Sequence, residues 1–300
     1  MCKTIYNRGY STKDITIFGF RSNDDKGYCT STNNLEGIIF SVIVPVKGPL
    51  NKKWLEYLDN IFPHDSEIIL IGENISHWTP SSRKIILIEA KCNRSQARNL
   101  GLSICKGDLV FFFDIDQIPS KRLVDEAVEL FKKGYDMIKV PERFIGTTLW
   151  GRASALWKTS IQEADKEYGC IPRIYSRRVF SRIGGFDINL DILEDFILYL
   201  RARKAGLKEA WALSPLYHFE QRSLREIIEK SFFYAKALYS LRVKGAENKV
   251  ILVKYVKAIH AFIKVITSKE DLGVKICCIA LIAFRLVLII SQFIRRIIRI

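Results

Sequence analysis

The sequence predicts an α/β domain with a mostly parallel sheet, followed by C-terminal helices that are amphipathic or hydrophobic. Between residues 38 and 140, short apolar runs rich in Val, Ile and Phe alternate with segments of helical spacing. Such runs are typical of strands that are buried on both faces of a parallel sheet. From residue 223 onward, the apolar residues have the spacing or composition of helices. The chain has 300 residues, 48% of them hydrophobic, which suffices for one large core or two modest ones.

Strands and helices are expected along most of the chain after residue 38. Strands are predicted at 40–46, 67–71, 84–89, 109–113 and 135–140, and helices at 52–61, 95–105, 193–204, 224–241, 250–266 and 276–294. A further helix is expected to open at Pro119, because a proline is tolerated in the first helical turn. The stretch 145–192 has an irregular pattern.

Three regions follow from this order. Residues 1–37 are polar and are predicted to form a loosely ordered extension, in which 15–20 could add a short strand. Residues 38–222 form the predicted α/β domain. Residues 223–300 form the predicted helical region for membrane association.

The positive charge is concentrated at the C-terminal end. Residues 241–300 carry twelve Lys and Arg against three acidic residues, and so account for +9 of the net charge of +15. An anionic partner is therefore expected there. The seven cysteines include no C-x-x-C spacing, which argues against a zinc site and favours a reducing compartment. The N-terminus lacks the apolar segment of a secretory signal peptide.

The apolar run 109–113 leads directly into two carboxylates, Asp114 and Asp116. Their i, i+2 spacing puts both on the same side of the chain at the end of a buried strand. Two carboxylates held this close repel each other unless a cation joins them, and oxygen ligands suit Mg²⁺ or Mn²⁺. An isolated pair of this kind is more often a solvated surface turn, so its sequence context decides the interpretation.

That context consists of five short segments in a fixed order. They are Ser41–Pro45, Arg94–Gly101, Gly107–Asp116, Gly184–Asp187 and Leu193–Gly206. In this order, the region from about residue 40 to 220 resembles the family 2 glycosyltransferases, which have the GT-A fold, a Rossmann-like nucleotide-sugar domain. The resemblance implies an enzyme that takes a sugar from a UDP- or GDP-sugar, with Mn²⁺ or Mg²⁺ as cofactor.

The resemblance also implies which residues bind the nucleotide. Pro45, Val46 and Glu73 would lie around the base, although Glu73 could equally be a loop charge. Family members often have an Asp after the second strand, where this chain has Gly72 and Glu73, so the base stays open.

The diphosphate and sugar are assigned to two later motifs. Arg98 and Asn99 would lie near the diphosphate, because a planar guanidinium can pair with two phosphate oxygens; the alternative is a solvated helix face. Gly185 and Asp187 belong to a turn at the sugar pocket, where Asp187 could bind a sugar hydroxyl.

The metal and catalytic residues complete the set. By the resemblance, Asp114 and Asp116 form the metal-binding pair: Asp116 would ligate the metal directly, and Asp114 would lean toward the ribose or a metal-bound water. His218 could complete the site or be structural. Asp195 would be the general base, with Glu194 as its alternate or as a ligand for an acceptor hydroxyl. The alternative for both is a first-turn carboxylate stabilised by the helix dipole.

The segment 276–294 is close to the length of about 20 residues that spans a bilayer core. An arginine at its middle, Arg285, would cost roughly 2.5–3.5 kcal/mol there. Arg285 shares a helix face with Gln292, Arg296 and Arg299, which favours a helix in the interface or a polar seam in an oligomer. A buried C-terminal helix of a soluble protein is the remaining alternative. Either membrane mode places the catalytic domain at the cytoplasmic face of the cell membrane.

These expectations combine into one function. The protein is expected to be an inverting, metal-dependent glycosyltransferase that acts on a hydroxyl of a lipid-linked or cell-envelope glycan. The alternatives are a polyprenyl-phosphate sugar synthase and a non-catalytic relative that binds nucleotide-sugars. A nucleic-acid partner is not expected, because the basic residues lie beside a very apolar tail and not in an aromatic and basic groove.

Overall fold

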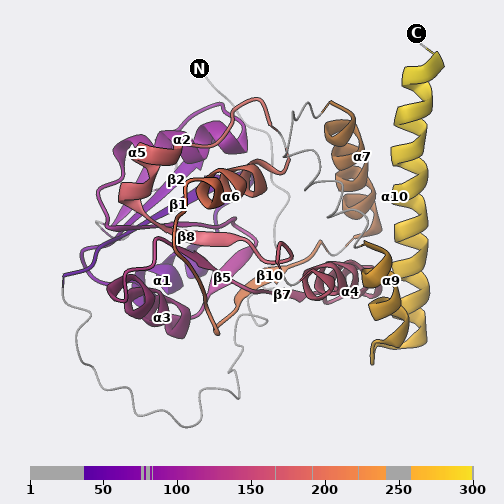
Figure 1. The fold of residues 1–300 in the computed structure, drawn as a ribbon, viewed down its shortest axis with the longest axis horizontal. Coiled ribbons are helices and arrows are strands. Elements are labelled where there is room, and N and C mark those ends of the chain that lie inside the picture. Colours follow the sequence, from indigo (N-terminus) through magenta and orange to yellow (C-terminus); the bar gives the residue numbers. More distant parts are fainter. Residues whose placement is uncertain are drawn as a thin grey trace.

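The computed structural model describes most of the chain, from residue 37 to residue 298. The described residues are 37–75, 78, 82, 84–165, 167–190, 192–221, 223–240 and 258–298, without the side chains of 238–240, 292, 293 and 295–298. The predicted extension 1–37, apart from Gly37, and the strand expected at 15–20 lie outside these residues. The described part has a layered α/β body and a group of helices on one side of it (Figure 1).

A seven-stranded sheet forms the centre of the body, in the order β3-β2-β1-β4-β8-β6-β9. Its strands are β1 (Phe40–Val46), β2 (Glu67–Gly72), β3 (Ile85–Glu89), β4 (Leu109–Phe112), β6 (Met137–Lys139), β8 (Pro172–Ser176) and β9 (Glu209–Trp211). Strand β1 is parallel to β2 and β4, whereas β8 is antiparallel to both of its neighbours. The predicted α/β class with a mostly parallel sheet is confirmed.

Helices cover both faces of this sheet. On one face lie α1 (Lys52–Ile61) and α3 (Lys121–Lys132), and on the other lie α2 (Arg94–Ile104), α5 (Phe180–Ile183) and α6 (Glu194–Lys204). The side chains of β4 alternate between the two cores, with Phe111 in the first and Phe112 in the second. This alternation explains why the strands have almost no polar residues.

Two expectations about the elements are wrong. Pro119 does not open a helix but ends the short strand β5 (Gln117–Pro119), and α3 begins two residues later. Ser120 caps that helix, because its side chain accepts a hydrogen bond from the backbone N–H of Leu123 at 3.1 Å. The stretch 145–192 is not irregular, since it contains α4 (Leu149–Ala164) as well as β8. The buried face of α4 is built largely from small Ala, Ser and Gly residues, which hides its periodicity.

A second sheet of three strands brings distant residues to the end of β4. Its order is β5-β10-β7, with β10 at Leu216–Phe219 and β7 at Glu142–Ile145. Strand β10 is antiparallel to β5 and parallel to β7, so His218 pairs with Gln117 on one side and with Phe144 on the other. His218 is thereby fixed beside the turn that carries Asp114 and Asp116.

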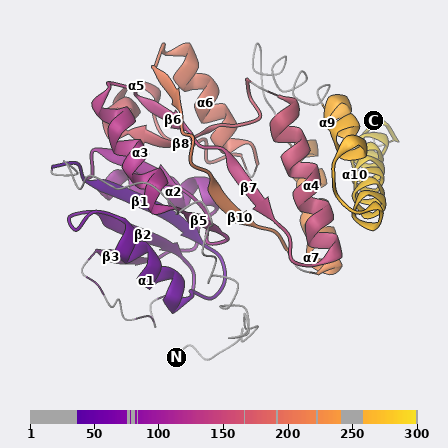
Figure 2. The same ribbon diagram turned by 90° about the horizontal axis from the view of Figure 1, so that it is seen from below.

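The C-terminal helices pack against α4 at the side of the body (Figures 1 and 2). They are α7 (Leu224–Ser240), α9 (Ala258–Thr267) and α10 (Leu272–Ile298). A third core cluster joins them to α4, and it contains Ala153, Leu156, Ile227, Val265, Val274, Cys278 and Leu281. Helix α10 is longer than the predicted 276–294, and residues 250–257 of the expected preceding helix lie outside the described residues. The predicted boundary between 222 and 223 stays a prediction.

Candidate active site

The site begins at the carboxyl end of β4, where the chain turns from the large sheet into the small one. Asp114, Ile115 and Asp116 form this turn. The backbone N–H of Asp114 donates to the side-chain oxygen of Gln117 at 2.9 Å, and the backbone N–H of Gln117 donates to the Asp114 carbonyl at 2.9 Å. On the other side, the Asp116 carbonyl accepts a hydrogen bond from the backbone N–H of Phe219. The two carboxylates are thus held on a short, doubly fixed turn.

Arg98 joins two carboxylates beneath this turn. Its side chain is 1% exposed, and its Nη1 and Nη2 lie 2.8 Å from Glu194 and 3.1 Å from Asp114. The Phe186 ring lies 5.2 Å from the guanidinium carbon. Burial alone would raise the pKa of Asp114, but Arg94 and Arg98 hold that pKa well below its ordinary value. The contacts of Arg98 here are therefore with the protein, and its predicted diphosphate role stays a prediction.

Arg94, one turn earlier on α2, is the more accessible of the two arginines. Its side chain is 43% exposed, and it lies 4.0 Å from Asp114 and 3.5 Å from Glu194. A partly exposed guanidinium beside Asp114 can reach the phosphate oxygens of a bound ligand. The solvated helix face that the sequence offered as an alternative for Arg98 fits Arg94 better.

Glu194 and Asp195 open α6 but have different surroundings. Glu194 is buried, and burial together with the neighbouring Asp195 raises its pKa. Asp195 is 25% exposed, and its carboxylate accepts hydrogen bonds from Arg173 at 3.2 Å and from the Phe196 backbone at 2.8 Å. The preceding Leu193 has a φ of 60°, a backbone conformation that costs energy in a residue with a Cβ.

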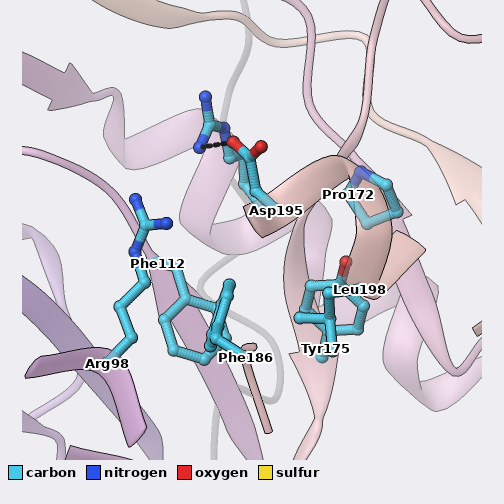
Figure 3. A pocket seen from close by; sticks show the side chains of 8 residues that line it. Arg98, Phe112, Pro172, Tyr175, Phe186, Asp195 and Leu198 are labelled. Atoms are coloured by element: carbon cyan, nitrogen blue, oxygen red, sulfur yellow. Dashed lines mark hydrogen bonds and ion pairs between the residues drawn. The ribbon is translucent and has the colours of Figure 1, made fainter. Parts of the chain in front are cut away.

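Figure 3 shows the carboxylate of Asp195 apart from Arg98, and its dashed line marks the ion pair between Asp195 and Arg173. Asp195 also lines a cavity of about 230 Å³, together with Glu142, Lys158, Arg173 and His218. The structure therefore places Asp195, and not Glu194, where a ligand hydroxyl can reach it. Of the two sequence candidates for the base, the geometry favours Asp195.

A chain of charged contacts connects Asp195 with Asp116. Arg173 donates from Nε to Glu142 at 3.1 Å and from Nη1 to Asp195. Glu142 lies 2.6 Å from Nδ1 of His218 through its other oxygen. The Nε2 of His218 in turn lies 3.5 Å from the carboxylate of Asp116. Burial and Lys158 oppose a charge on His218, but Asp116 and Glu142 raise its pKa.

The residues at Asp116 fit a divalent cation. One oxygen of Asp116 is buried and has no hydrogen-bond partner among the described residues. Glu142 occupies Nδ1 of His218, which leaves Nε2 facing Asp116, as is usual for a histidine that binds a metal. Within the described residues, no three His, Cys, Asp or Glu side chains form a metal group. Mg²⁺ and Mn²⁺ commonly use one or two protein ligands and complete their shell with water and phosphate oxygens. Asp114 faces the two arginines, so its role as a ligand stays a prediction.

One comparison with known families matches part of the chain. Residues 71–183 match the family model described as Glycosyl transferase family 2. Over this segment the chain has a family 2 glycosyltransferase domain. The matched segment runs from the end of β2 to α5 and contains Arg98, Asp114 and Asp116. The predicted GT-A fold and the enzyme class are therefore confirmed.

Two similar solved structures have low sequence identity to the chain. S. aureus TarS 1-349 is 17% identical with a TM-score of 0.45, over 84% of this chain and 81% of that chain. The mannosyltransferase PcManGT from Pyrobaculum calidifontis, in complex with GDP-Man and Mn²⁺, is 16% identical with a TM-score of 0.49, over 86% of each chain. No curated protein matches the sequence significantly.

The predicted base-binding residues of the glycosyltransferase lie at the ends of β1 and β2. Pro45 is partly exposed, Val46 is buried and Glu73 is exposed. The two strand ends approach so closely that a Cβ on Gly72 would lie 2.2 Å from the Val46 carbonyl oxygen. This edge is the carboxyl end of parallel strands, where ligands of open α/β sheets bind. The base-binding role of these three residues stays a prediction.

Asn99 and Gly185 act together in the fold. Asn99 accepts a hydrogen bond from the Phe186 N–H at 2.7 Å and donates to the Phe186 carbonyl at 2.8 Å. This clamp holds the Phe186 ring over Arg98. Asp187 is exposed and accepts hydrogen bonds from Asn189 in a local turn. The ligand contacts predicted for Asn99, Gly185 and Asp187 stay predictions.

A Gly185→Ala substitution is expected to destabilise the glycosyltransferase by about 1–3 kcal/mol, because overpacking a fixed contact displaces its neighbours. A Cβ at this position would lie 2.3 Å from the side-chain oxygen of Asn99. Urea unfolding measures the change. Gly273→Ala is the control, since an added Cβ there meets only Leu149 Cδ1 at 3.8 Å, which is an ordinary contact. If Gly185→Ala unfolds like the wild type, the Asn99 clamp is not rigid.

Several residues of the site escaped the sequence analysis. They are Glu142, Lys158 and Arg173, which line the cavity beside Asp195 and His218. Each has its charged partner elsewhere in the chain: Glu142 pairs with Arg173, and Lys158 pairs with Glu220, just after β10. The one usable sequence clue is a charged residue inside a strand-like run, such as Arg173 between Pro172 and Ile174.

Proposed function

We propose that the protein is an inverting, divalent-metal-dependent glycosyltransferase. It moves a sugar from a UDP- or GDP-sugar to a hydroxyl of a lipid-linked or cell-envelope glycan, at the cytoplasmic face of the cell membrane. The observation that carries the proposal is the single cavity that Asp195 and His218 both line. It brings a candidate base and a candidate metal ligand to the lining of one space.

Asp116 and His218 would hold the metal, and Glu142 would fix the orientation of the histidine ring. A divalent ion bound there supplies positive charge beside the diphosphate oxygen that gains negative charge as it leaves. Arg94 is accessible enough to bind the diphosphate from the α2 side. These side chains would thus bind the donor from two directions.

The Asp195 carboxylate would take the proton from the hydroxyl of the acceptor substrate as that oxygen attacks the anomeric carbon. The new glycosidic bond forms on the face opposite the departing diphosphate, so the anomeric configuration inverts. Arg173 holds the Asp195 carboxylate in place through their ion pair. The Glu142 carboxylate in turn fixes Arg173, so that the base and the histidine share one support.

The C-terminal helices support an acceptor at a membrane. Among the described residues, one helix is long and apolar enough to cross a bilayer, with a mean hydropathy of 2.5 over Leu272–Ser291. Only 28% of this segment is buried inside the protein. An acceptor attached to a lipid would be presented at the same surface.

Donor hydrolysis by the purified protein tests the proposal. UDP-, GDP- and dTDP-sugars are compared with Mn²⁺, with Mg²⁺ and with EDTA, in both binding and slow hydrolysis. We expect one nucleotide class to bind and hydrolyse with metal and to lose both in EDTA. Hydrolysis that persists in EDTA would contradict the metal requirement. Failure of every donor to bind would indicate a non-catalytic relative.

A further inference from the structure

We infer that the outer faces of α9 and α10 form a docking surface for an anionic lipid bilayer, and that α10 lies along this bilayer without crossing it. The inference deepens the proposed membrane location and rests on it for the choice of partner. The mode of docking is derived from how α10 packs on the catalytic domain.

The outer face of α10 is a continuous apolar stripe. Its exposed residues are Leu272, Ile276, Ile279, Leu286, Ile290 and Ile294. They are spaced by whole or double helical turns, so they lie on one side over about 33 Å of helix. Ile259, Ile263 and Ile266 of α9 are more than half exposed and have the same spacing. An apolar face of this extent is unusual on a soluble monomer and marks an interaction site.

The opposite face of α10 is buried against the protein. Val274, Cys278 and Leu281 pack with residues of α4, α7 and α9 in the third core cluster. Figures 1 and 2 both show α10 at the outer edge, with α4 on its inner side. Arg285 also lies on this inner side, where its Nε donates to the Ser231 hydroxyl at 3.1 Å. Arg285, whose charge would cost free energy in a spanning helix, thus points away from the outer stripe.

This packing argues against a helix that crosses the bilayer. Helix α4 belongs to the catalytic domain, since it follows β7 directly. Ion pairs lie where it meets the α9–α10 hairpin, namely Arg152 with Glu270 and Asp271, and Lys264 with Glu163. If α10 crossed the bilayer with this packing intact, α4 and these charges would enter the hydrocarbon. Each Arg, Lys or Asp there would cost roughly 2.5–3.5 kcal/mol. Lying in the interface, α10 buries its stripe while the inner face keeps its protein partners.

The charge of this region selects a lipid surface over a second copy of the chain. By sequence, residues 241–300 carry twelve basic and three acidic residues, so two copies of this region would repel each other when brought together. Anionic headgroups instead attract basic residues, by about 1 kcal/mol for each one near the surface. Two lysines with described side chains lie near the start of α10. Lys269 is on the loop before the helix, and Lys275 is in its first turn, beside the apolar stripe.

Vesicle flotation of the full chain tests the surface. The probes are phosphatidylcholine vesicles with and without phosphatidylglycerol. We expect binding to the anionic vesicles that weakens with salt, and at least about tenfold weaker binding for the double variant Ile276→Gln/Ile290→Gln. Leu213→Gln is the matched control, because Leu213 is 81% exposed on the catalytic domain. Equal binding of the double variant and the control would overturn the docking surface. So would a dimer that the double variant dissociates in solution, since it would show a second copy on the stripe.

A second measurement distinguishes lying from crossing. The variants Ile276→Trp and Ile290→Trp each add one tryptophan to the outer face of α10. Their fluorescence is measured with lipids brominated at shallow or deep positions, and the quenching of the parent protein is subtracted. The two positions are about 21 Å apart along the helix. An in-plane helix gives both tryptophans the same shallow depth, whereas a spanning helix separates them and overturns the inference. Donor hydrolysis in solution is measured for every variant. If the parent protein binds anionic vesicles but hydrolyses no donor, the result counts against the proposed function alone.

Discussion

An Asp195→Asn substitution is expected to reduce sugar transfer by about 10²- to 10⁴-fold, the usual contribution of a general base. Donor binding should stay within a few-fold of the wild type, because the ion pair of Asp195 is with Arg173, whereas Arg94 and Arg98 pair with Asp114. The asparagine oxygen can still accept the hydrogen bond from Arg173, so the fold should be kept. Initial transfer rates and donor dissociation constants, measured on the same preparation, separate the two effects.

Two further variants make this result specific. Glu129→Gln removes an exposed carboxylate on α3, away from the site, and should not change the rate. Glu194→Gln replaces a buried partner of Arg98 and should lower stability more than it lowers the rate per folded molecule. A rate that survives Asp195→Asn but is lost in well-folded Glu194→Gln would assign the base to Glu194.

The sheet could be predicted from the sequence because its strands are buried on both faces. The apolar run from Leu109 to Phe113 fits a strand that is buried on both faces, and all five residues are buried. The sequence therefore predicted both this strand and the position of Asp114 at its end. The resemblance offered His218 as a possible partner of Asp114 and Asp116, and the structure brings His218 to 3.5 Å from Asp116, although their role as metal ligands stays a prediction. Their distances did not follow, because the register of β5, β10 and β7 sets them.

The network around Glu142 could not be predicted, for a physical reason. Glu142, Arg173 and His218 come from three separate strands, and each pair is formed only once both sheets are assembled. Sequence spacing carries no information on such contacts, in contrast to i, i+4 pairs on one helix. The buried position of Arg98 was missed for the same reason, since its two partners lie 16 and 96 residues away.

The tail was predicted in composition but not in orientation. The sequence identified Arg285 as a residue that a spanning helix would bear at a cost, and left the spanning and interfacial modes open. The structure shows Arg285 on the packed face beside Ser231, which no periodicity in the tail alone could reveal. Only the position of α4, outside the tail, gives α10 an inner and an outer face.

An Asp116→Ala substitution is expected to weaken Mn²⁺ binding by at least about 100-fold and to remove metal-stimulated donor hydrolysis. The reason is that Asp116 carries the one unpartnered buried carboxylate oxygen of the turn, among the described residues, and faces Nε2 of His218. A carboxylate ligand contributes both charge and position to a bound cation, and its loss costs several kcal/mol at the charge that develops on the leaving group. A Mn²⁺ titration, in which electron paramagnetic resonance detects the free ion, measures binding without any turnover.

Glu142→Gln tests the same metal site through a residue that contacts His218 and not the cation. Glu142 contacts His218 at Nδ1 but lies on the far side of the ring from Asp116, so we expect a smaller loss of about 10- to 100-fold in Mn²⁺ affinity. Thermal unfolding of the metal-free protein corrects for the lost ion pair with Arg173. The expected order is wild type, then Glu142→Gln, then Asp116→Ala. If Asp114→Ala abolishes Mn²⁺ binding while Asp116→Ala leaves it unchanged, the cation is held on the arginine side of the turn, and His218 is not its ligand.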